Sequence, residues 1–259
     1  MNLFTSDDVI VITGAAGGLG AAMCRRFAEL GARVALTDLQ SSDGAGEAES
    51  LGRDVRFFAM DVTDKADIQR AANAIEDAMG PVTGVVANAG IAPTNPTLDY
   101  TRETWDKVIA VNQTGVFLTA QVFAERMKTE DRKARAGGRN CAMVFTSSIA
   151  GLTTVHPERH IAYGASKAAV SHMAALLGVE WATRGIRVNA IAPGYIDTPI
   201  LDAIKKENPD MLEEWVAAMP IKRLLQPREV ADVAAFLLSD MASSITGETV
   251  ACDGGYSKA

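Results

Sequence analysis

The sequence has 259 residues, of which 48% are hydrophobic and 22% are charged. A chain of this length and composition can bury a sizeable core without disulfides or a structural metal. Its 25 basic and 32 acidic side chains give a formal net charge of −7. This acidity argues against nucleic acid as a partner, because phosphate backbones bind basic surfaces.

The first residues contain no targeting signature, and no apolar stretch approaches the roughly 20 residues that a membrane span needs. We therefore expect a cytoplasmic protein with no membrane partner. Cys24, Cys141 and Cys252 are widely separated and form no Cys-x-x-Cys pair. Small buried hydrophobes are thus favoured over a disulfide framework or a zinc site, and we expect no metal.

Short β-branched runs alternate with longer amphipathic runs along the chain. We expect strands at Val9–Thr13, Arg33–Asp38, Val55–Ala59, Val82–Asn88, Cys141–Thr146, Arg187–Ala192 and Thr249–Cys252, and helices at Leu19–Leu30, Lys65–Met79, Arg102–Lys128, Tyr163–Thr183 and Val230–Leu238. The strands are almost continuously apolar, which predicts a parallel sheet covered on both faces. The expected fold is α/β: a Rossmann-type doubly wound sheet of about seven strands. No linker or repeat interrupts the pattern, so residues 1–259 are expected to form a single domain.

A glycine-rich turn follows the first expected strand. It reads TGAAGGLG over residues 13–20 and leads directly into the first expected helix. Glycines allow positive φ and let a pyrophosphate approach the backbone, while the helix N-terminus offers free N–H groups to its negative charge. Gly14, Gly18, Leu19 and Gly20 are therefore predicted to bind a dinucleotide; a plain tight turn is the alternative that this motif alone leaves open.

The second expected strand ends in Asp38, 18 residues beyond Gly20. A carboxylate at this spacing can accept hydrogen bonds from the adenosine ribose hydroxyls. No Arg or Lys lies at positions 37, 39 or 15–17 to receive the 2′-phosphate of NADP. At about 4 Å, two like charges repel by roughly 4 kcal/mol at an effective dielectric constant near 20. The sequence thus predicts NAD (NAD+/NADH) as the cofactor, preferred over NADP.

Tyr163 and Lys167 lie four residues apart in an expected helix, so their side chains share one face. An ammonium beside a phenol favours phenolate and moves the tyrosine toward the range in which it can exchange a proton with an alcohol. Upstream, the strand at Cys141–Thr146 runs into a pair of hydroxyls, Ser147 and Ser148. Ser148, Tyr163 and Lys167 are the candidate catalytic residues.

Together these motifs resemble the short-chain dehydrogenase/reductase family, in its compact single-domain branch, over essentially the whole chain. The matching residues are Thr13, Gly14, Gly18 and Gly20; Asp61 and Val62; Asn88, Ala89 and Gly90; Asn112; Ser148; Tyr163 and Lys167; Pro193 and Gly194; Thr198; and Asp253, Gly254 and Gly255.

The resemblance implies roles for many of these residues. Ser148 would hydrogen-bond the substrate oxygen, Tyr163 would transfer its proton, and Lys167 would hold the nicotinamide ribose while lowering the tyrosine pKa. Asn112 would complete a proton relay through water. Three further groups of residues would contact the cofactor. They are Asp61 and Val62 near the adenine; Asn88, Ala89 and Gly90 after the fourth strand; and Pro193, Gly194, Ile196 and Thr198 around the nicotinamide.

Two features depart from the family pattern. Ser148 and Tyr163 are 15 residues apart, more than is usual, which predicts a small insertion at 151–161. Gly17 also completes Thr-Gly-x-x-Gly-x-x-Gly, the pattern of the longer sugar-nucleotide epimerase branch. Only four residues follow Gly255, so we expect no separate substrate domain and prefer the compact branch.

Substrate choice is expected to depend on the 151–161 loop and on a lid at 195–219. Candidate substrate contacts are Ile91, Leu152, His156, Tyr195 and Trp215, each of which could equally be an ordinary core or loop residue. His156 and His160 do not form His-Glu-x-x-His, and Pro157 disfavours a helix that would align them on zinc. Their imidazoles, or Arg159, could instead contact a polar or acidic substrate; plain exposure to solvent is the alternative.

The leading hypothesis is an NAD-dependent oxidoreductase that interconverts a secondary alcohol and a ketone, with Tyr163 as general acid/base. Reduction of a 3-oxoacyl thioester is an alternative that Asp38 disfavours, because it would be more natural with NADPH. A non-catalytic dinucleotide-binding sensor or scaffold is a second alternative, which would have no need of Tyr163. The resemblance also implies a homotetramer formed through the helices at Arg102–Lys128 and Tyr163–Thr183.

Overall fold

The computed structural model describes residues 2–127, 141–198, 201 and 209–259. Within them, seven parallel strands form one sheet in the order β3-β2-β1-β4-β5-β6-β7. The strands are β1 Val9–Thr13, β2 Arg33–Asp38, β3 Val55–Ala59, β4 Val82–Ala87, β5 Cys141–Thr146, β6 Ile186–Pro193 and β7 Thr249–Cys252. The strand order reverses between β1 and β4, which confirms the predicted doubly wound parallel sheet.

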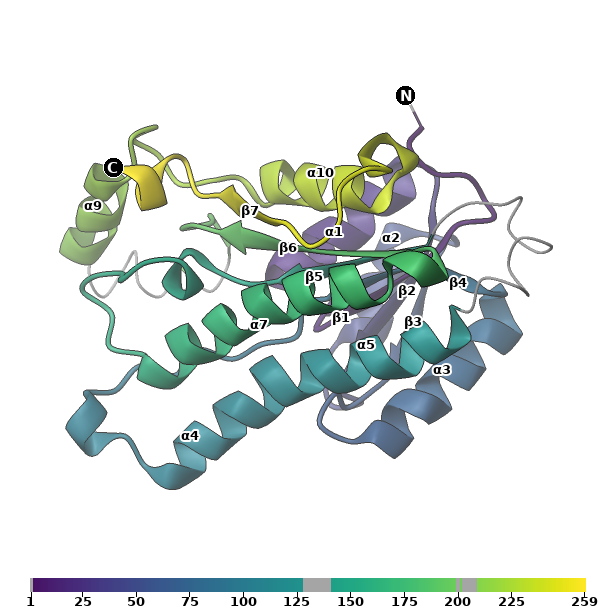
Figure 1. Ribbon diagram of the computed structural model, residues 1–259, viewed down its shortest axis with the longest axis horizontal. Helices are drawn as coiled ribbons and strands as arrows, with labels where there is room; N and C mark the ends of the chain where they lie inside the picture. Colours follow the sequence, from purple (N-terminus) through teal and green to yellow (C-terminus); the bar gives the residue numbers. More distant parts are fainter. Residues whose placement is uncertain (1, 128–140, 199–200, 202–208) are drawn as a thin grey trace.

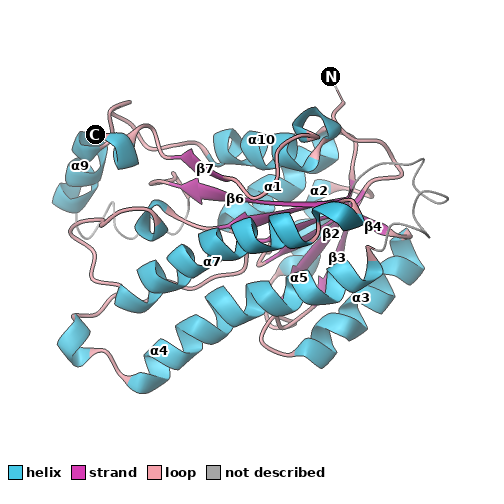
Figure 2. Cartoon of the chain, viewed as in Figure 1, coloured by secondary structure: helices cyan, strands magenta, loops and turns pink. Residues whose placement is uncertain are grey.

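Helices cover both faces of this sheet (Figures 1 and 2). The helices are α1 Gly18–Glu29, α2 Gly44–Leu51, α3 Lys65–Met79, α4 Arg102–Ile109, α5 Gly115–Arg126, α7 Ile161–Glu180, α9 Pro209–Ala218 and α10 Pro227–Leu238. Buried side chains of α1, α2 and α10 form one core with the sheet, and those of α3, α5 and α7 form the other. Successive side chains of a strand point to opposite faces of the sheet, so the apolar strands contribute residues to both cores.

The start and the buried face of a helix follow from its sequence. Asp64 caps α3 by accepting a hydrogen bond from the Ala66 N–H at 2.8 Å, which satisfies a donor that the helix itself cannot pair. The α3 residues Ile68, Ile75 and Met79 then recur at helical spacing and are buried. Capping and the apolar stripe therefore fix the same helix that the sequence predicts.

Several elements have bounds that differ from the predicted ones by a few residues, and three differences have a clear physical cause. The polar stretch after β2 contains a helix, α2, whose buried residues are only Gly44 and Ala48; an apolar face this narrow gives little periodicity. A five-residue π-helical segment, Ala110–Thr114, separates α4 from α5 within the expected single helix at Arg102–Lys128. Helix α10 begins at Pro227, because Glu229 accepts a hydrogen bond from the Gln226 N–H at 2.8 Å. Lys128 lies outside the described residues.

Candidate active site

A cleft with a volume of about 1500 Å³ opens at the carboxyl ends of the strands, where ligands bind in doubly wound sheets. The predicted site residues that line it are Gly14, Gly18, Leu19, Gly20, Asp38, Asp61, Val62, Asn88, Ala89, Gly90, Ser148, Tyr163, Gly194, Ile196 and Thr198. Three others, Asn112, Lys167 and Pro193, are buried and do not line the cleft.

The glycine-rich turn is fastened to the end of β4. The Thr13 hydroxyl accepts hydrogen bonds from the N–H groups of Asn88 and Ala89, both at 2.9 Å. In return, the Asn88 amide donates to the carbonyls of Thr13 and Gly14 at 3.1 and 3.0 Å. Gly14 has φ +62°, and a Cβ on it would lie 2.6 Å from the Ala89 Cα. Only glycine therefore fits at position 14.

The other side of the turn faces open space. A Cβ built on Gly17 or Gly18 would meet nothing within 4 Å, and both residues line the cleft beside Leu19 and Gly20. Helix α1 begins here, so the N–H groups of its first turn have no partner within the helix. Such a cradle of free N–H groups at a helix N-terminus beside uncovered backbone is a common binding site for phosphate groups.

Asp38 lies at the end of β2, next to this cradle. Its carboxylate accepts hydrogen bonds from the Ala16 N–H at 2.9 Å and from the Leu39 N–H at 2.7 Å, which orient it at the edge of the cleft. Arg70 lines a neighbouring hollow with Leu39, but its guanidinium is engaged by Asp67 at 2.6 Å and by the Ala59 carbonyl at 2.9 Å. The charge that faces the cleft at this point is therefore the Asp38 carboxylate.

Asp61 and Val62 follow β3 on the same side of the cleft. The Asp61 carboxylate accepts hydrogen bonds from the N–H and the hydroxyl of Thr63, at 2.8 and 2.7 Å. The Val62 side chain is buried and lies where a Cβ on Gly115 would touch it. Both residues thus form part of the cleft wall on the side of Asp38.

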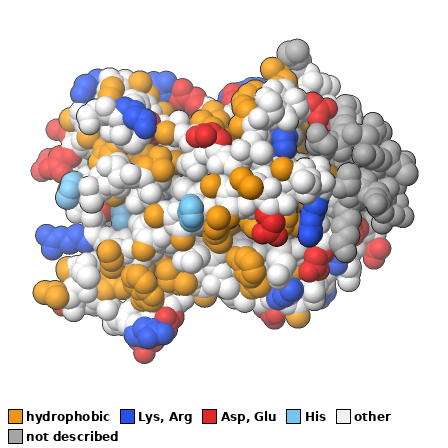
Figure 3. Space-filling model, in the orientation of Figure 1, with side chains coloured by type: hydrophobic (Ala, Val, Ile, Leu, Met, Phe, Trp, Pro, Cys, Tyr) orange, Lys and Arg blue, Asp and Glu red, His pale blue; other side chains and the backbone are white. Residues whose placement is uncertain are grey.

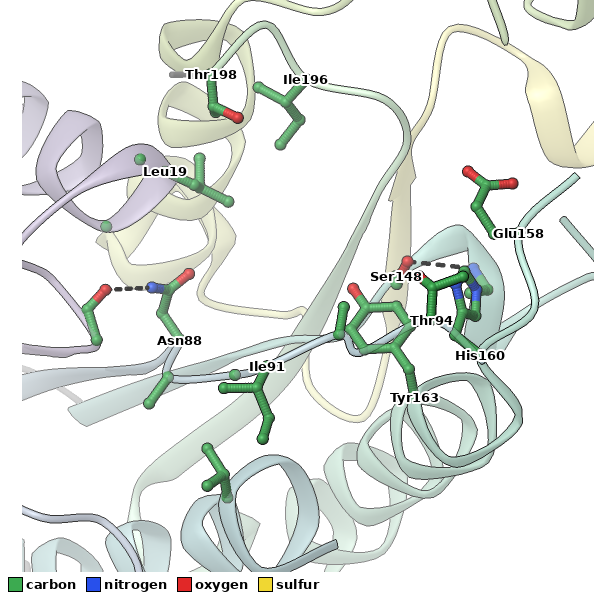
Figure 4. A pocket seen from close by; sticks show the side chains of 18 of the residues that line it. Leu19, Asn88, Ile91, Thr94, Ser148, Glu158, His160, Tyr163, Ile196 and Thr198 are labelled. Carbon is green, nitrogen blue, oxygen red and sulfur yellow. Dashed lines mark hydrogen bonds between the residues drawn. The ribbon is translucent and has the colours of Figure 1, made fainter. Parts of the chain in front are cut away.

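Ser148, Tyr163 and Lys167 are brought together by β5 and α7. Ser148 follows β5 and accepts a hydrogen bond from the Ala150 N–H at 3.2 Å, while Tyr163 lies in the first turn of α7. Figure 4 shows the Tyr163 hydroxyl directed into the open centre of the cleft, with Ser148 beside it. The Lys167 Nζ lies 5.6 Å from the centroid of the Tyr163 ring. The Ser147 hydroxyl points elsewhere, to the Lys167 carbonyl at 2.8 Å.

Burial shifts the pKa values of two residues in this group. Burial raises the pKa of Tyr163, and the interaction with the Ser148 hydroxyl opposes that rise. Burial lowers the pKa of Lys167 from 10.5 to about 8. The net pKa of Tyr163 is thus raised above its ordinary value, because removal from water disfavours the charged form of both groups.

Asn112 lies in the π-helical segment and is completely buried. Its amide oxygen accepts a hydrogen bond from the Ile91 N–H at 2.8 Å, and its amide nitrogen donates to the Ile91 carbonyl at 2.9 Å and to the Ser166 hydroxyl at 3.2 Å. The side chain thus joins the turn after β4 to helix α7.

The substrate end of the cleft differs in part from the expected one. Ile91, Tyr195 and Trp215 line the cleft, whereas Leu152 and His156 are exposed and do not. Three residues of the 156–160 loop line the cleft instead: Glu158, Arg159 and His160. The nearness of His160 to Tyr163 in the sequence was the signal, since residues three apart meet on one helical turn.

Two aromatic residues of the segment expected to form a lid, Tyr195 and Trp215, line this end of the cleft. Tyr195 is stacked on Trp215 of α9, with ring centroids 4.4 Å apart, and meets Tyr256 edge-on at 5.7 Å. Leu201 and Met211 also line the cleft. Tyr256, near the C-terminus, is a neighbour that the sequence did not reveal. The lid residues 199–200 and 202–208 lie outside the described part of the chain.

Among the described residues, no helix is long and apolar enough to span a bilayer. The same part of the chain contains no group of three or more His, Cys, Asp or Glu side chains placed to hold a metal ion. Cys24, Cys141 and Cys252 form no disulfide.

A parallel sheet in this order, with a glycine-rich cradle beside a Ser, Tyr and Lys group, defines a doubly wound α/β oxidoreductase. Comparison with known proteins agrees. A family model described as enoyl-(acyl carrier protein) reductase matches residues 14–257. The chain belongs to the short-chain dehydrogenase/reductase family, whose members bind a nicotinamide cofactor, and it is an oxidoreductase that acts on alcohol groups.

Relatives with different substrates are equally similar to the chain. A galactitol 2-dehydrogenase (L-tagatose-forming) of Cereibacter sphaeroides is 39% identical, with 95% of this chain and 93% of the relative covered. An acetoacetyl-CoA reductase of Synechocystis is also 39% identical, with 99% of each chain covered. The crystal structure of gox2181 superimposes with a TM-score of 0.91 at 36% identity, covering 98% of this chain and 97% of that one. Identity alone therefore does not select the substrate.

Proposed function

We propose that the protein is an NAD(H)-dependent dehydrogenase that interconverts a secondary alcohol and a ketone, with Tyr163 as general acid/base. The observation that carries this proposal is that the Tyr163 hydroxyl faces the same cleft as the glycine-rich cradle, with Ser148 beside it and the Lys167 ammonium 5.6 Å from its ring. The similarity to a galactitol 2-dehydrogenase supports alcohol as the substrate.

The residues present fit a nicotinamide dinucleotide. The cradle at Gly17 and Gly18 would hold the pyrophosphate, and Asp38 would accept hydrogen bonds from the adenosine ribose. Ile196 and Thr198, which Figure 4 shows across the open centre of the cleft from Tyr163, would lie beside the nicotinamide. When bound, this group supplies the acceptor or donor of the hydride.

The chain itself handles the proton. In the oxidation direction, the Ser148 hydroxyl holds the substrate oxygen, and the Tyr163 phenolate accepts the proton of the alcohol O–H while the carbinol C–H bond breaks. The Lys167 ammonium stabilises the phenolate charge. Because oxidation needs phenolate and burial raises the pKa of Tyr163, oxidation should accelerate as the pH rises, whereas the phenol that ketone reduction needs is already populated below that pKa.

Two features support NAD over NADP. Asp38 presents a negative charge where the 2′-phosphate of NADP would lie, and like charges repel there. The guanidinium of Arg70 is paired with Asp67, and Arg70 does not line the cleft.

Reduction of a 3-oxoacyl thioester is the alternative, favoured by two cations that line the cleft, Lys107 and Arg159. The similarity to an acetoacetyl-CoA reductase supports it equally. Asp38 opposes it to the extent that such reductions use NADPH. A non-catalytic sensor is less well supported, because Ser148 and Tyr163 lie together at the cleft with the buried Lys167 ammonium 5.6 Å from the Tyr163 ring, and binding of a dinucleotide alone does not need an acid–base group.

The variant Tyr163→Phe tests the proposal. It should lower kcat for a secondary alcohol by about 10²–10⁴-fold and leave NADH binding, measured by fluorescence titration, within a few-fold of wild type. Tyr100→Phe is the matched control, because Tyr100 does not line the cleft and should keep normal turnover. Activity of Tyr163→Phe close to that of wild type would show that Tyr163 is not the general acid/base.

We also propose a homotetramer that uses the outer face of α7. Leu176 and Val179 are 56% and 76% exposed, and Phe117 of α5 is 44% exposed; Figure 3 shows this face, where hydrophobic side chains over α4, α5 and α7 reach the surface. Burial of such side chains drives association. Light scattering should give four times the chain mass; a stable monomer would contradict this assembly.

A further inference from the structure

Two buried polar atoms at the substrate end of the cleft have no hydrogen-bond partner among the residues that the structure describes. They are His160 Nε2 and Trp215 Nε1, and both residues line the cleft. Buried polar groups in folded proteins are normally hydrogen-bonded. Two unpaired ones at the same end of one cleft indicate groups that a ligand satisfies.

His160 lies next to the reacting position. Its ring meets the Tyr163 ring edge-on, with centroids 5.1 Å apart. Figure 4 shows His160 on the side of Tyr163 away from Asn88 and Leu19, and so away from the cofactor cradle. A substrate whose alcohol oxygen contacts Tyr163 would therefore extend toward His160.

The neighbouring groups can also accept and donate hydrogen bonds. The Tyr195 hydroxyl donates to one oxygen of the Glu158 carboxylate at 3.2 Å, and Glu158 lines the cleft. Tyr195 in turn is stacked on Trp215. The loop that carries Glu158 and His160 is held in place, because the Arg159 carbonyl accepts a hydrogen bond from the Asn95 N–H at 2.8 Å.

We propose that the substrate is a polyol, and that His160 hydrogen-bonds the hydroxyl on the carbon next to the one that is oxidised. This inference rests on the proposed function and names its substrate class. A hydroxyl both donates and accepts, so it fits either nitrogen state of a neutral imidazole and also the acceptor-only Glu158 carboxylate. Burial lowers the pKa of His160, which keeps the imidazole neutral and consistent with this role.

A 3-oxoacyl thioester matches these groups less well. Beyond its ketone it offers a methylene and a thioester carbonyl, which accepts hydrogen bonds but cannot donate one to Glu158. A donor-rich polyol satisfies the imidazole, the indole N–H and the carboxylate together.

The wild-type enzyme gives the first test, with NAD as cofactor. The quantity to measure is kcat/KM for butane-2,3-diol, butan-2-ol and 3-hydroxybutyryl-CoA. The inference expects the diol to exceed butan-2-ol by at least about tenfold, because a site built to bind a hydroxyl rejects the analogue that lacks it. Equal values for the two alcohols, or a preference for the thioester, would overturn the inference and leave an alcohol or acyl dehydrogenase standing. Oxidation of none of the three would instead overturn the proposed function.

Variants then assign the preference to His160. His160→Leu should reduce the ratio of kcat/KM for the diol to that for butan-2-ol toward one, and His160→Gln, which keeps a hydrogen-bonding amide, should restore part of it. Any general loss of activity cancels in this ratio, since both alcohols react at Tyr163. His172→Leu is the matched control, because His172 is exposed on α7 and does not line the cleft. A wild-type ratio in His160→Leu would exclude His160 as the contact.

Discussion

The Lys167 ammonium donates a hydrogen bond to the Thr146 carbonyl at 2.6 Å, inside the protein and beneath the Tyr163 ring. Lys167 is only 3% exposed, and one carbonyl is a weak substitute for the water that it loses. Burial therefore lowers its pKa to about 8. The cofactor-free enzyme thus holds a lysine whose charged form is disfavoured, at the place where catalysis needs a positive charge.

This arrangement predicts a pH-dependent stability. Between pH 8 and 10.5 the unfolded chain binds the Lys167 proton and the folded chain does not, so the free energy of unfolding rises with pH in that window and the full penalty applies below it. Relative to Lys167→Met, the cofactor-free wild type should gain about 2–3 kcal/mol between pH 7 and pH 10. Urea unfolding at the two pH values measures the difference.

Lys65→Met is the control, because Lys65 is also hydrogen-bonded, to Gln121 at 2.6 Å, but is only half-buried. Its stability relative to wild type should change little over the same range. If Lys167→Met and wild type differ by the same amount at both pH values, the lysine is not desolvated as the structure indicates.

Asp38 is expected to set the cofactor preference. Asp38→Asn removes the negative charge but keeps an oxygen that can accept the Ala16 N–H, so the turn should stay in place. The ratio of kcat/KM with NAD to that with NADP should fall by about 10–100-fold, since each 1.4 kcal/mol of relieved repulsion is tenfold. Asp43→Asn, a neighbouring carboxylate that does not line the cleft, should leave the ratio unchanged. A wild-type preference in Asp38→Asn would remove Asp38 from this role.

The sequence predicts most of the sheet because its strands are buried on both faces and read as apolar runs. β1, β2, β3, β5 and β7 have the predicted bounds. Helix α2 is not predicted, because its two buried residues, Gly44 and Ala48, are small. Gly44 packs against the Phe57 ring so closely that a Cβ would overlap it. A glycine contact of this kind leaves no hydrophobic signal.

For the site, the position of a residue relative to the strands and helices predicts whether it lies at the cleft. It does not predict the orientation of its side chain or its hydrogen-bond partners. The glycine-rich turn, Asp38 and Tyr163 follow strands or begin helices, so the topology brings them to one edge. The orientation of His160 and the stacking of Tyr195 on Trp215 depend on loops whose paths are set by tertiary contacts, such as that between Asn95 and Arg159.

Substitution by alanine should have different effects at two glycines of the turn, on stability at Gly20 and on NADH binding at Gly17. A Cβ on Gly20 would lie 2.4 Å from the Gly14 carbonyl oxygen, which is backbone and cannot move aside; Gly20→Ala should lower the free energy of unfolding by about 1–3 kcal/mol. Gly17 has extended backbone and open space around it, so Gly17→Ala should leave stability within about 0.5 kcal/mol.

The Gly17→Ala methyl group would instead project into the cleft, and NADH binding should weaken by about tenfold because the methyl group occupies space next to the pyrophosphate. Fluorescence titration of NADH and urea unfolding of the same two variants separate these effects. NADH affinity equal to that of wild type in Gly17→Ala would mean that the pyrophosphate does not lie in this cradle.

Asn112 should contribute to stability independently of any part it has in proton transfer. Asn112→Ala would leave the Ile91 N–H and carbonyl, which the amide now pairs, without partners at the base of the cleft. Each unsatisfied buried group costs about 1–3 kcal/mol, so the cofactor-free variant should lose about 2–4 kcal/mol in urea unfolding. Asn73→Ala is the control: Asn73 is exposed, accepts a hydrogen bond from Arg126, and should change stability by less than about 0.5 kcal/mol. Equal stability of the two variants would show that the Ile91 backbone finds other partners, and the role implied for Asn112 by the family would then rest on catalysis alone.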